Sequence, residues 1–303
     1  MRTLTFSVAA LLVAGFGFAA ADDLETTFQS LKEAEAKKDA PQVKKLAVEA
    51  IAMARQAAAA PAPDNAEEKE GWKQRVEYAH SIELHAEYSL YATAVQAPPA
   101  TMIELITTLE AQNPKSKYLD DAYGPYLVAL TRTGASAKVP EVAEKALLSF
   151  PDNEDLLLVV AENTRGRNPD RALTCSNHLV AVLSRHPKPE GVSAADWERK
   201  RSASLGRGYW MAGVISGERN RYADADRNLR AALPLIGGND AMMGPALFYL
   251  GFANYQLGKM TNSKAKVLEG AKFSEQAAAI NWTGARDAYK NSLNMKTEAG
   301  KMR

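Results

Sequence analysis

Two stretches of the chain, 209–235 and 245–273, share one pattern: a helix with a central glycine, a short turn, and a second helix. The central glycines are Gly213 and Gly251, which lie 38 positions apart. A glycine there lets a second helix approach closely, because no side chain separates the two backbones. The pattern therefore predicts two antiparallel helical hairpins, with turns near Asn220 and at Gly258-Lys259.

The second helix of each hairpin is predicted from residues that recur on one helical face. They are Tyr222, Ala225, Leu229 and Ala232 in the first hairpin, and Ala265, Leu268 and Ala271 in the second. Looser versions of the pattern occupy 28–53, 72–114, 123–151 and 154–187, and the first helix of the 72–114 block is overlong. Together they predict about six hairpins, with a last helix near 283–296 covering the apolar face that the final hairpin leaves open. No stretch alternates like a strand, so an all-α fold is expected.

The series Leu250-Gly251…Tyr255 and Tyr222…Ala225…Leu229…Ala232 resemble the tetratricopeptide repeat family, whose period is about 34 residues. This resemblance implies an α-solenoid in which the first helix of each hairpin lines a concave groove. Some members of the family bind peptide C-termini through a lysine–asparagine clamp. The matching positions here hold Trp210 and Val214, so the resemblance does not imply that activity.

Three parts are predicted along the chain: a signal peptide at 1–21, irregular and acidic hairpins at 22–114, and the solenoid with its capping helix at 115–303. Arg2, an apolar stretch at 6–18 and small residues up to Ala21 form a secretory signal. An uncleaved anchor is the alternative, although a spanning helix needs roughly 20 apolar residues. We therefore expect an exported protein, periplasmic or secreted, with no stable membrane span after cleavage. The stretch 57–71 is expected to be a linker or an exposed loop.

Charge is distributed unevenly between the two halves. Residues 22–163 hold 14 basic and 24 acidic residues, whereas 164–303 hold 22 and 12, giving net charges of −10 and +10. The run from Arg199 to Arg207 is either a solvated helix face or a patch for an acidic protein segment, an acidic polysaccharide or a lipid headgroup surface. Nucleic acid is disfavoured because export removes the chain from it. Opposite charges on the two halves also favour self-association.

A partner-binding site is expected on the first helices of the two best hairpins. Under the resemblance, the groove is lined by Arg207, Trp210, Phe248, Phe252 and Tyr255. Rigid aromatic rings beside a guanidinium suit an extended peptide or a helix of another protein. The alternative is that these rings pack between neighbouring hairpins.

No catalytic motif, cofactor site or metal site is expected. Glu77 and His80 share one helix face, but a di-iron bundle needs a second Glu-x-x-His, which the sequence lacks. Cys175 is the one cysteine and is expected in a helix interior. The expected function is a non-catalytic protein–protein interaction scaffold in the cell envelope or secreted space. The alternatives are a self-assembling structural envelope protein and a helical support module of a cell-wall or sugar-acting enzyme.

Overall fold

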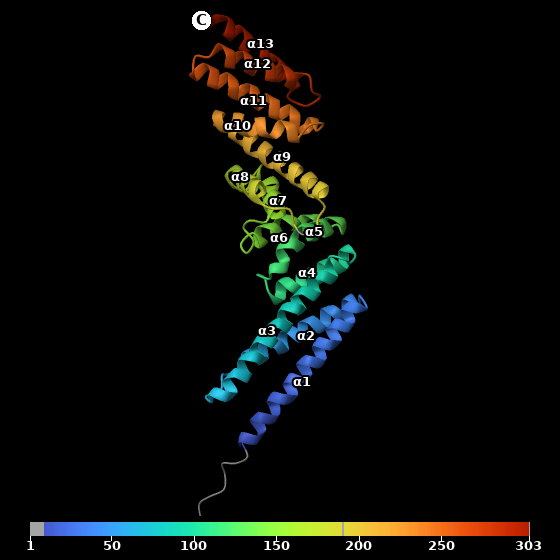
Figure 1. Cartoon of the computed structure of the whole chain (residues 1–303). Coiled ribbons are helices and arrows are strands. Elements are labelled where there is room, and N and C mark those ends of the chain that lie inside the picture. The colour runs from blue at the N-terminus through green and yellow to red at the C-terminus, as the bar shows by residue number, and fades with distance from the viewer. Residues whose placement is uncertain (1–8, 190, 303) are drawn as a thin grey trace, which may run out of the picture. The chain divides into compact units, whose positions relative to one another are not determined.

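The computed structural model describes residues 9–189 and 191–302, with side chains from Asp22 onward. Within these ranges the chain forms thirteen α-helices and two 3₁₀ turns and no strand, which confirms the predicted all-α class (Figure 1). Residues 1–8 of the predicted signal peptide lie outside the described residues, and 9–21 are described only as backbone at the start of the first helix. No helix in the described ranges is long and apolar enough to span a membrane.

The helical contacts divide the chain into two units, the first ending at Val139 and the second beginning at Pro140. The helices of the first unit are α1 (Ala9–Ala36), α2 (Ala40–Ala58), α3 (Ala66–Ala94), α4 (Pro99–Gln112) and α5 (Lys117–Arg132), followed by the 3₁₀ turn η1 (Ser136–Lys138). Each of these α-helices packs on the next one along the chain. The overlong helix predicted within 72–114 is α3, which has 29 residues.

The expected loop at 57–71 is wrong in length. The alanines after Met53 continue α2 to Ala58, since alanine favours helix more than any other residue. Helix α3 begins at Ala66, where the Asn65 side chain accepts a hydrogen bond from the backbone N–H of Glu67. The loop is therefore confined to 59–65.

The second unit holds the remaining helices. They are α6 (Val139–Ala146), α7 (Glu154–Thr164), α8 (Pro169–Arg185), α9 (Ala194–Glu218), α10 (Tyr222–Ala232), α11 (Asp240–Met260), α12 (Lys264–Ala278) and α13 (Ala285–Lys301), with the 3₁₀ turn η2 (Leu233–Leu235) after α10. From α7 onward each helix packs on the next (Figure 1). In addition α7 contacts α9, α9 contacts α11, and α11 contacts α13.

Both of the best hairpins are confirmed, α9 with α10 and α11 with α12. Gly251 lies at a close approach of the second pair, because a Cβ there would be 2.9 Å from the Gly270 carbonyl oxygen. The predicted turn at Gly258-Lys259 is wrong, because Gly258 is inside α11 and faces Val267 of α12. The turn follows at 261–263, where Asn262 adopts a φ of 49°.

The predicted face of α12 is also shifted. Val267 and Ala271 are buried, whereas the expected core residue Leu268 is 45% exposed. Helix α13 covers this face, since Met295 and Ala299 pack in one cluster with Val267 and Ala271. The predicted capping helix is therefore confirmed in position, and it extends to Lys301.

Candidate partner-binding site

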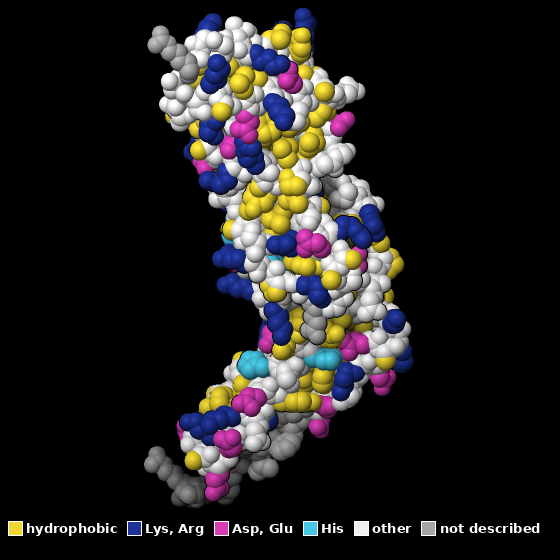
Figure 2. Space-filling view, turned by 45° about the horizontal axis from the view of Figure 1, so that its top comes forward, with side chains coloured by type: hydrophobic (Ala, Val, Ile, Leu, Met, Phe, Trp, Pro, Cys, Tyr) yellow, Lys and Arg dark blue, Asp and Glu magenta, His cyan; other side chains and the backbone are white. Residues whose placement is uncertain are grey.

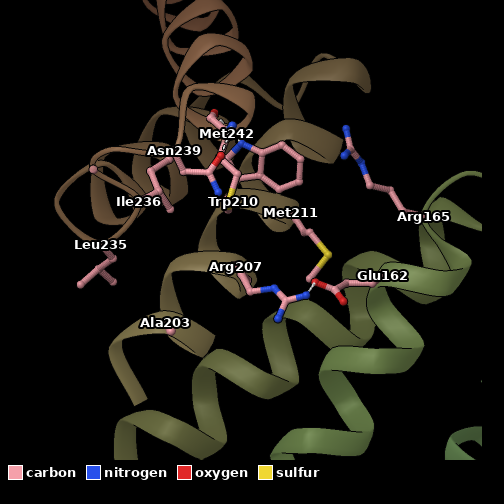
Figure 3. A pocket seen from close by; sticks show the side chains of 11 residues that line it. Glu162, Arg165, Ala203, Arg207, Trp210, Met211, Leu235, Ile236, Asn239 and Met242 are labelled. Carbon is pink, nitrogen blue, oxygen red and sulfur yellow. Dashed lines mark hydrogen bonds and ion pairs between the residues drawn. The ribbon is translucent and has the colours of Figure 1, made fainter. Parts of the chain in front are cut away.

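The second unit has a partly open pocket of about 600 Å³, and Figure 3 shows the side chains that line it. Three odd-numbered helices, α7, α9 and α11, contribute to it, together with the segment between α10 and α11. Its lining residues are Glu162, Arg165, Ala203, Arg207, Trp210, Met211, Leu235, Ile236, Gly237, Asn239 and Met242. The volume lies in the range of about 300–1,000 Å³ that is usual for ligand pockets.

One wall of the pocket depends on Gly206 in α9. A Cβ at this position would lie 3.0 Å from the Leu235 Cβ and 3.3 Å from the Ile236 Cγ2. The absence of a side chain lets the segment after α10 close against α9. Leu235 and Ile236 thereby form an apolar wall beside the side chains that α9 presents to the pocket.

The Trp210 ring is held in a fixed orientation. Its Nε1 donates a hydrogen bond to the Met242 carbonyl oxygen at 2.8 Å, and its ring packs against the core formed by α9, α10 and α11. The alternative interpretation, in which the aromatic rings pack between neighbouring hairpins, therefore describes Trp210 in part. The same ring also lines the pocket, so it is available to a bound group (Figure 3).

Arg165 follows the last residue of α7 and reaches the Trp210 ring. Its guanidinium carbon lies 4.5 Å from the ring centroid, a cation–π geometry. The nearest carboxylate is that of Glu218, 3.6 Å from Arg165 Nη2. At 3.6 Å this contact is an ion pair rather than a direct hydrogen bond, so the N–H donors of Arg165 can still approach a second carboxylate.

The Glu218 carboxylate is shared with Tyr249 of α11. Burial, and then the negative charge of Glu218, raise the pKa of Tyr249 above its usual value, while Arg165 acts in the opposite direction. The phenol therefore stays neutral beside the Glu218 carboxylate.

Arg207 has a different environment. Its guanidinium forms a close ion pair with Glu162 of α7 inside the pocket, marked by the dashed line in Figure 3. Both side chains are more than one-third exposed, so this contact is screened by water and is weak in energy. The positive charge of Arg207 therefore already lies next to the negative charge of Glu162.

The rest of the predicted basic run is also paired. Arg199 lies 3.2 Å from Asp196, Arg201 lies 3.5 Å from Glu198, and Lys200 bridges Glu154 and Asp155 at 3.2 and 2.7 Å. In Figure 2 the basic side chains on the visible face likewise lie among acidic ones. The run does not form a uniform basic patch.

The five residues predicted for partner binding do not all meet. Arg207 and Trp210 line the pocket, whereas Phe248, Phe252 and Tyr255 do not. Phe248 packs against Tyr249 and Trp282, Phe252 against Tyr222, and Tyr255 against the cluster beneath α13. All three are half-buried in contacts between helices. Val214, which the resemblance placed on the groove, is wholly buried.

Several pocket residues were missed by the sequence analysis. Arg165, Asn239 and Met242 reach the pocket only because α7 and α11 pack on α9, and no local pattern marks them. Elsewhere, His80 lies 3.6 Å from Glu83, and no group of three metal-ligating side chains occurs in the described ranges. Cys175 is buried, as predicted.

Comparison of the sequence with models of known protein families gives no match, and a comparison with curated proteins gives none either.

Proposed function

We propose that this chain is an exported, non-catalytic scaffold that binds another protein in the pocket on α9. The observation that carries the proposal is the meeting of Arg207 and Trp210 with an apolar wall in one open pocket. Arginine and tryptophan are the residues most enriched among those that carry binding energy at protein interfaces. An open pocket of this size accepts a few side chains of a partner while the rest of the partner stays outside.

The proposal includes a tetratricopeptide-like α-solenoid. The contacts among α7, α9, α11 and α13 support it, because first helices of successive repeats touch one another as well as their own second helices. The pocket draws Glu162, Arg207 and Met242 from three of these helices. In such a stack the first helices line the inner face, which is the face that repeat proteins use for binding.

The test is affinity capture with a variant that fills the pocket without touching the core. Ala203 is exposed and lines the pocket, so Ala203→Trp should block entry. Ala195→Trp is the matched control, because Ala195 is also exposed on α9 and lies outside the pocket. The full chain, expressed with its own N-terminus, would be used to capture partners from the exported fraction of the source cells, followed by mass spectrometry.

One partner at near-equal amount is expected with the wild type and with Ala195→Trp, and it should be lost with Ala203→Trp. Melting curves by circular dichroism establish that both variants are folded. Equal capture by Ala203→Trp would refute the pocket as the binding site.

Self-assembly is a second candidate, favoured by the net charges of −10 and +10 on the two halves. Attraction between exposed charges is screened over a Debye length of about 10 Å at 0.1 M salt and about 3 Å at 1 M. Sedimentation velocity should then show larger species at low salt that dissociate at high salt. A single monomeric species at both salt concentrations would eliminate this candidate.

A further inference from the structure

The most unusual group in the pocket is the guanidinium of Arg165. It lies over the Trp210 ring, with its carbon 4.5 Å from the ring centroid, and its ion pair with Glu218, at 3.6 Å, is longer than a direct hydrogen bond. Its side chain is one-third exposed, so it is partly removed from water. Stacking holds the plane of the guanidinium while the N–H groups on its edges point away from the ring and can meet a carboxylate.

We propose that Arg165 recognises the side-chain carboxylate of an aspartate or glutamate that stands beside apolar residues in an extended segment of a partner protein. The inference rests on the proposed function, since it names the chemical group that the proposed pocket binds. A planar guanidinium presents paired N–H donors whose geometry matches the two oxygens of a carboxylate. A wholly apolar segment would offer the guanidinium no acceptor of its own.

The apolar part of the recognition follows from the opposite wall. Leu235, Ile236 and Met242 line the pocket around the Trp210 ring. Ile236 is only 4% exposed, so Leu235 and Met242 provide most of the surface for one or two aliphatic residues next to the bound carboxylate. Methionine is flexible enough to pack against side chains of different shapes, so the apolar neighbours need not be of one type.

Arg207 is less suited to this role because its ion pair with Glu162 is closer than that of Arg165 with Glu218. Glu162 also makes the pocket selective, since a carboxylate entering on the Arg207 side would meet its negative charge. The carboxylate is therefore directed to Arg165, and the apolar neighbours are directed to the wall formed by Leu235 and Ile236.

The experiment uses three synthetic octapeptides, blocked at both ends so that no terminal carboxylate is present. They differ only at one central position, which is aspartate, asparagine or leucine between two leucines. Fluorescence anisotropy measures their binding to the full chain. The aspartate peptide is expected to bind about tenfold more tightly than the asparagine peptide, because a hydrogen bond to a charged group is stronger than a neutral one.

Arg165→Gln should abolish this preference while weaker binding of all three peptides persists. Arg199→Gln is the matched control, since it removes one exposed cation of α9 outside the pocket and should leave the preference intact. Arg165→Lys keeps the charge but loses the planar donors, and should retain only part of the preference.

Equal affinity for the aspartate and asparagine peptides in the wild type would overturn the inference, as would a failure of all three peptides to bind. The proposed function is judged separately. If the peptides bind without preference and Ala203→Trp prevents their binding, the pocket binds peptides. In that case only the proposed recognition of a carboxylate is wrong. If Ala203→Trp affects neither the peptides nor the captured partner, both proposals are wrong.

Discussion

Replacing Gly251 with alanine sets two effects of opposite sign against each other. Gly251 is in the middle of α11, where alanine should stabilise the helix by about 0.5–1 kcal/mol relative to glycine. The new Cβ would, however, lie 2.4 Å from the Ser274 Oγ and 2.9 Å from the Gly270 carbonyl oxygen of α12. The serine can rotate, but the carbonyl belongs to the backbone of a packed helix and can move only if α12 shifts.

Overpacking of this kind typically costs about 1–3 kcal/mol, so we expect Gly251→Ala to lower the free energy of unfolding by about 1–2 kcal/mol. Gly251→Leu should cost more. For a unit of this size, 1 kcal/mol corresponds to a shift of roughly 2–4 °C in melting temperature. Thermal unfolding followed by circular dichroism would measure it.

The matched control is Gly300→Ala, in α13. A Cβ at Gly300 has no neighbour within 4 Å, so only the helix preference acts, and the melting temperature should stay the same or rise slightly. If Gly251→Ala behaved like Gly300→Ala, α11 and α12 would not approach closely at Gly251. The placement of the hairpin would then be wrong.

Three further outcomes are expected. N-terminal sequencing of exported protein should find a start near Asp22, and retention of residue 1 in a membrane pellet would contradict the signal peptide. Burial raises the pKa of both Tyr123 and Tyr126 above the usual 10, so the unfolded chain loses these protons at a lower pH than the folded chain. The free energy of unfolding should therefore fall as pH rises above 10. A free energy of unfolding that stayed constant in this pH range would contradict the burial of the two phenols. Asn254→Leu should lower the free energy of unfolding, measured in urea, by about 1–3 kcal/mol, because the wholly buried Asn254 amide donates a hydrogen bond to Asp226 at 2.6 Å. An unchanged free energy of unfolding would argue against this hydrogen bond.

The positions of the helical hairpins could be predicted because their pattern is local. Gly251 marked a close helix contact correctly, since small residues at helical spacing have few other uses. The face of α12 could not be predicted, because Val267 and Leu268 are adjacent and both apolar. A step of one residue turns a helix by about 100°, so only contact with Gly258 of α11 decides that Val267 faces inward.

The candidate site was predictable to the extent that it lies on one helix. Arg207 and Trp210 are three residues apart on α9, so they share a face and enter the same pocket. The aromatic residues of α11 were grouped with them from their place in the repeat. Their rings pack instead against Tyr222, Trp282 and the α12–α13 cluster, which only the stacking of helices determines.

The net charge of a segment does not show where its charged side chains lie or which groups they contact. The net +10 of residues 164–303 left open whether the run from Arg199 to Arg207 is a solvated helix face or a patch for an acidic partner, and each of these cations lies beside a carboxylate. Pairing of this kind leaves long-range attraction to an acidic partner but little capacity for a new contact. Arg165 was not singled out by any charge pattern, and it is the arginine that the fold holds against an indole ring, with its carboxylate partner 3.6 Å away. Recognition should therefore depend more on how a guanidinium is held at the pocket than on the number of positive charges, which is why Arg165→Gln and Arg199→Gln, equal in charge, are expected to differ in binding.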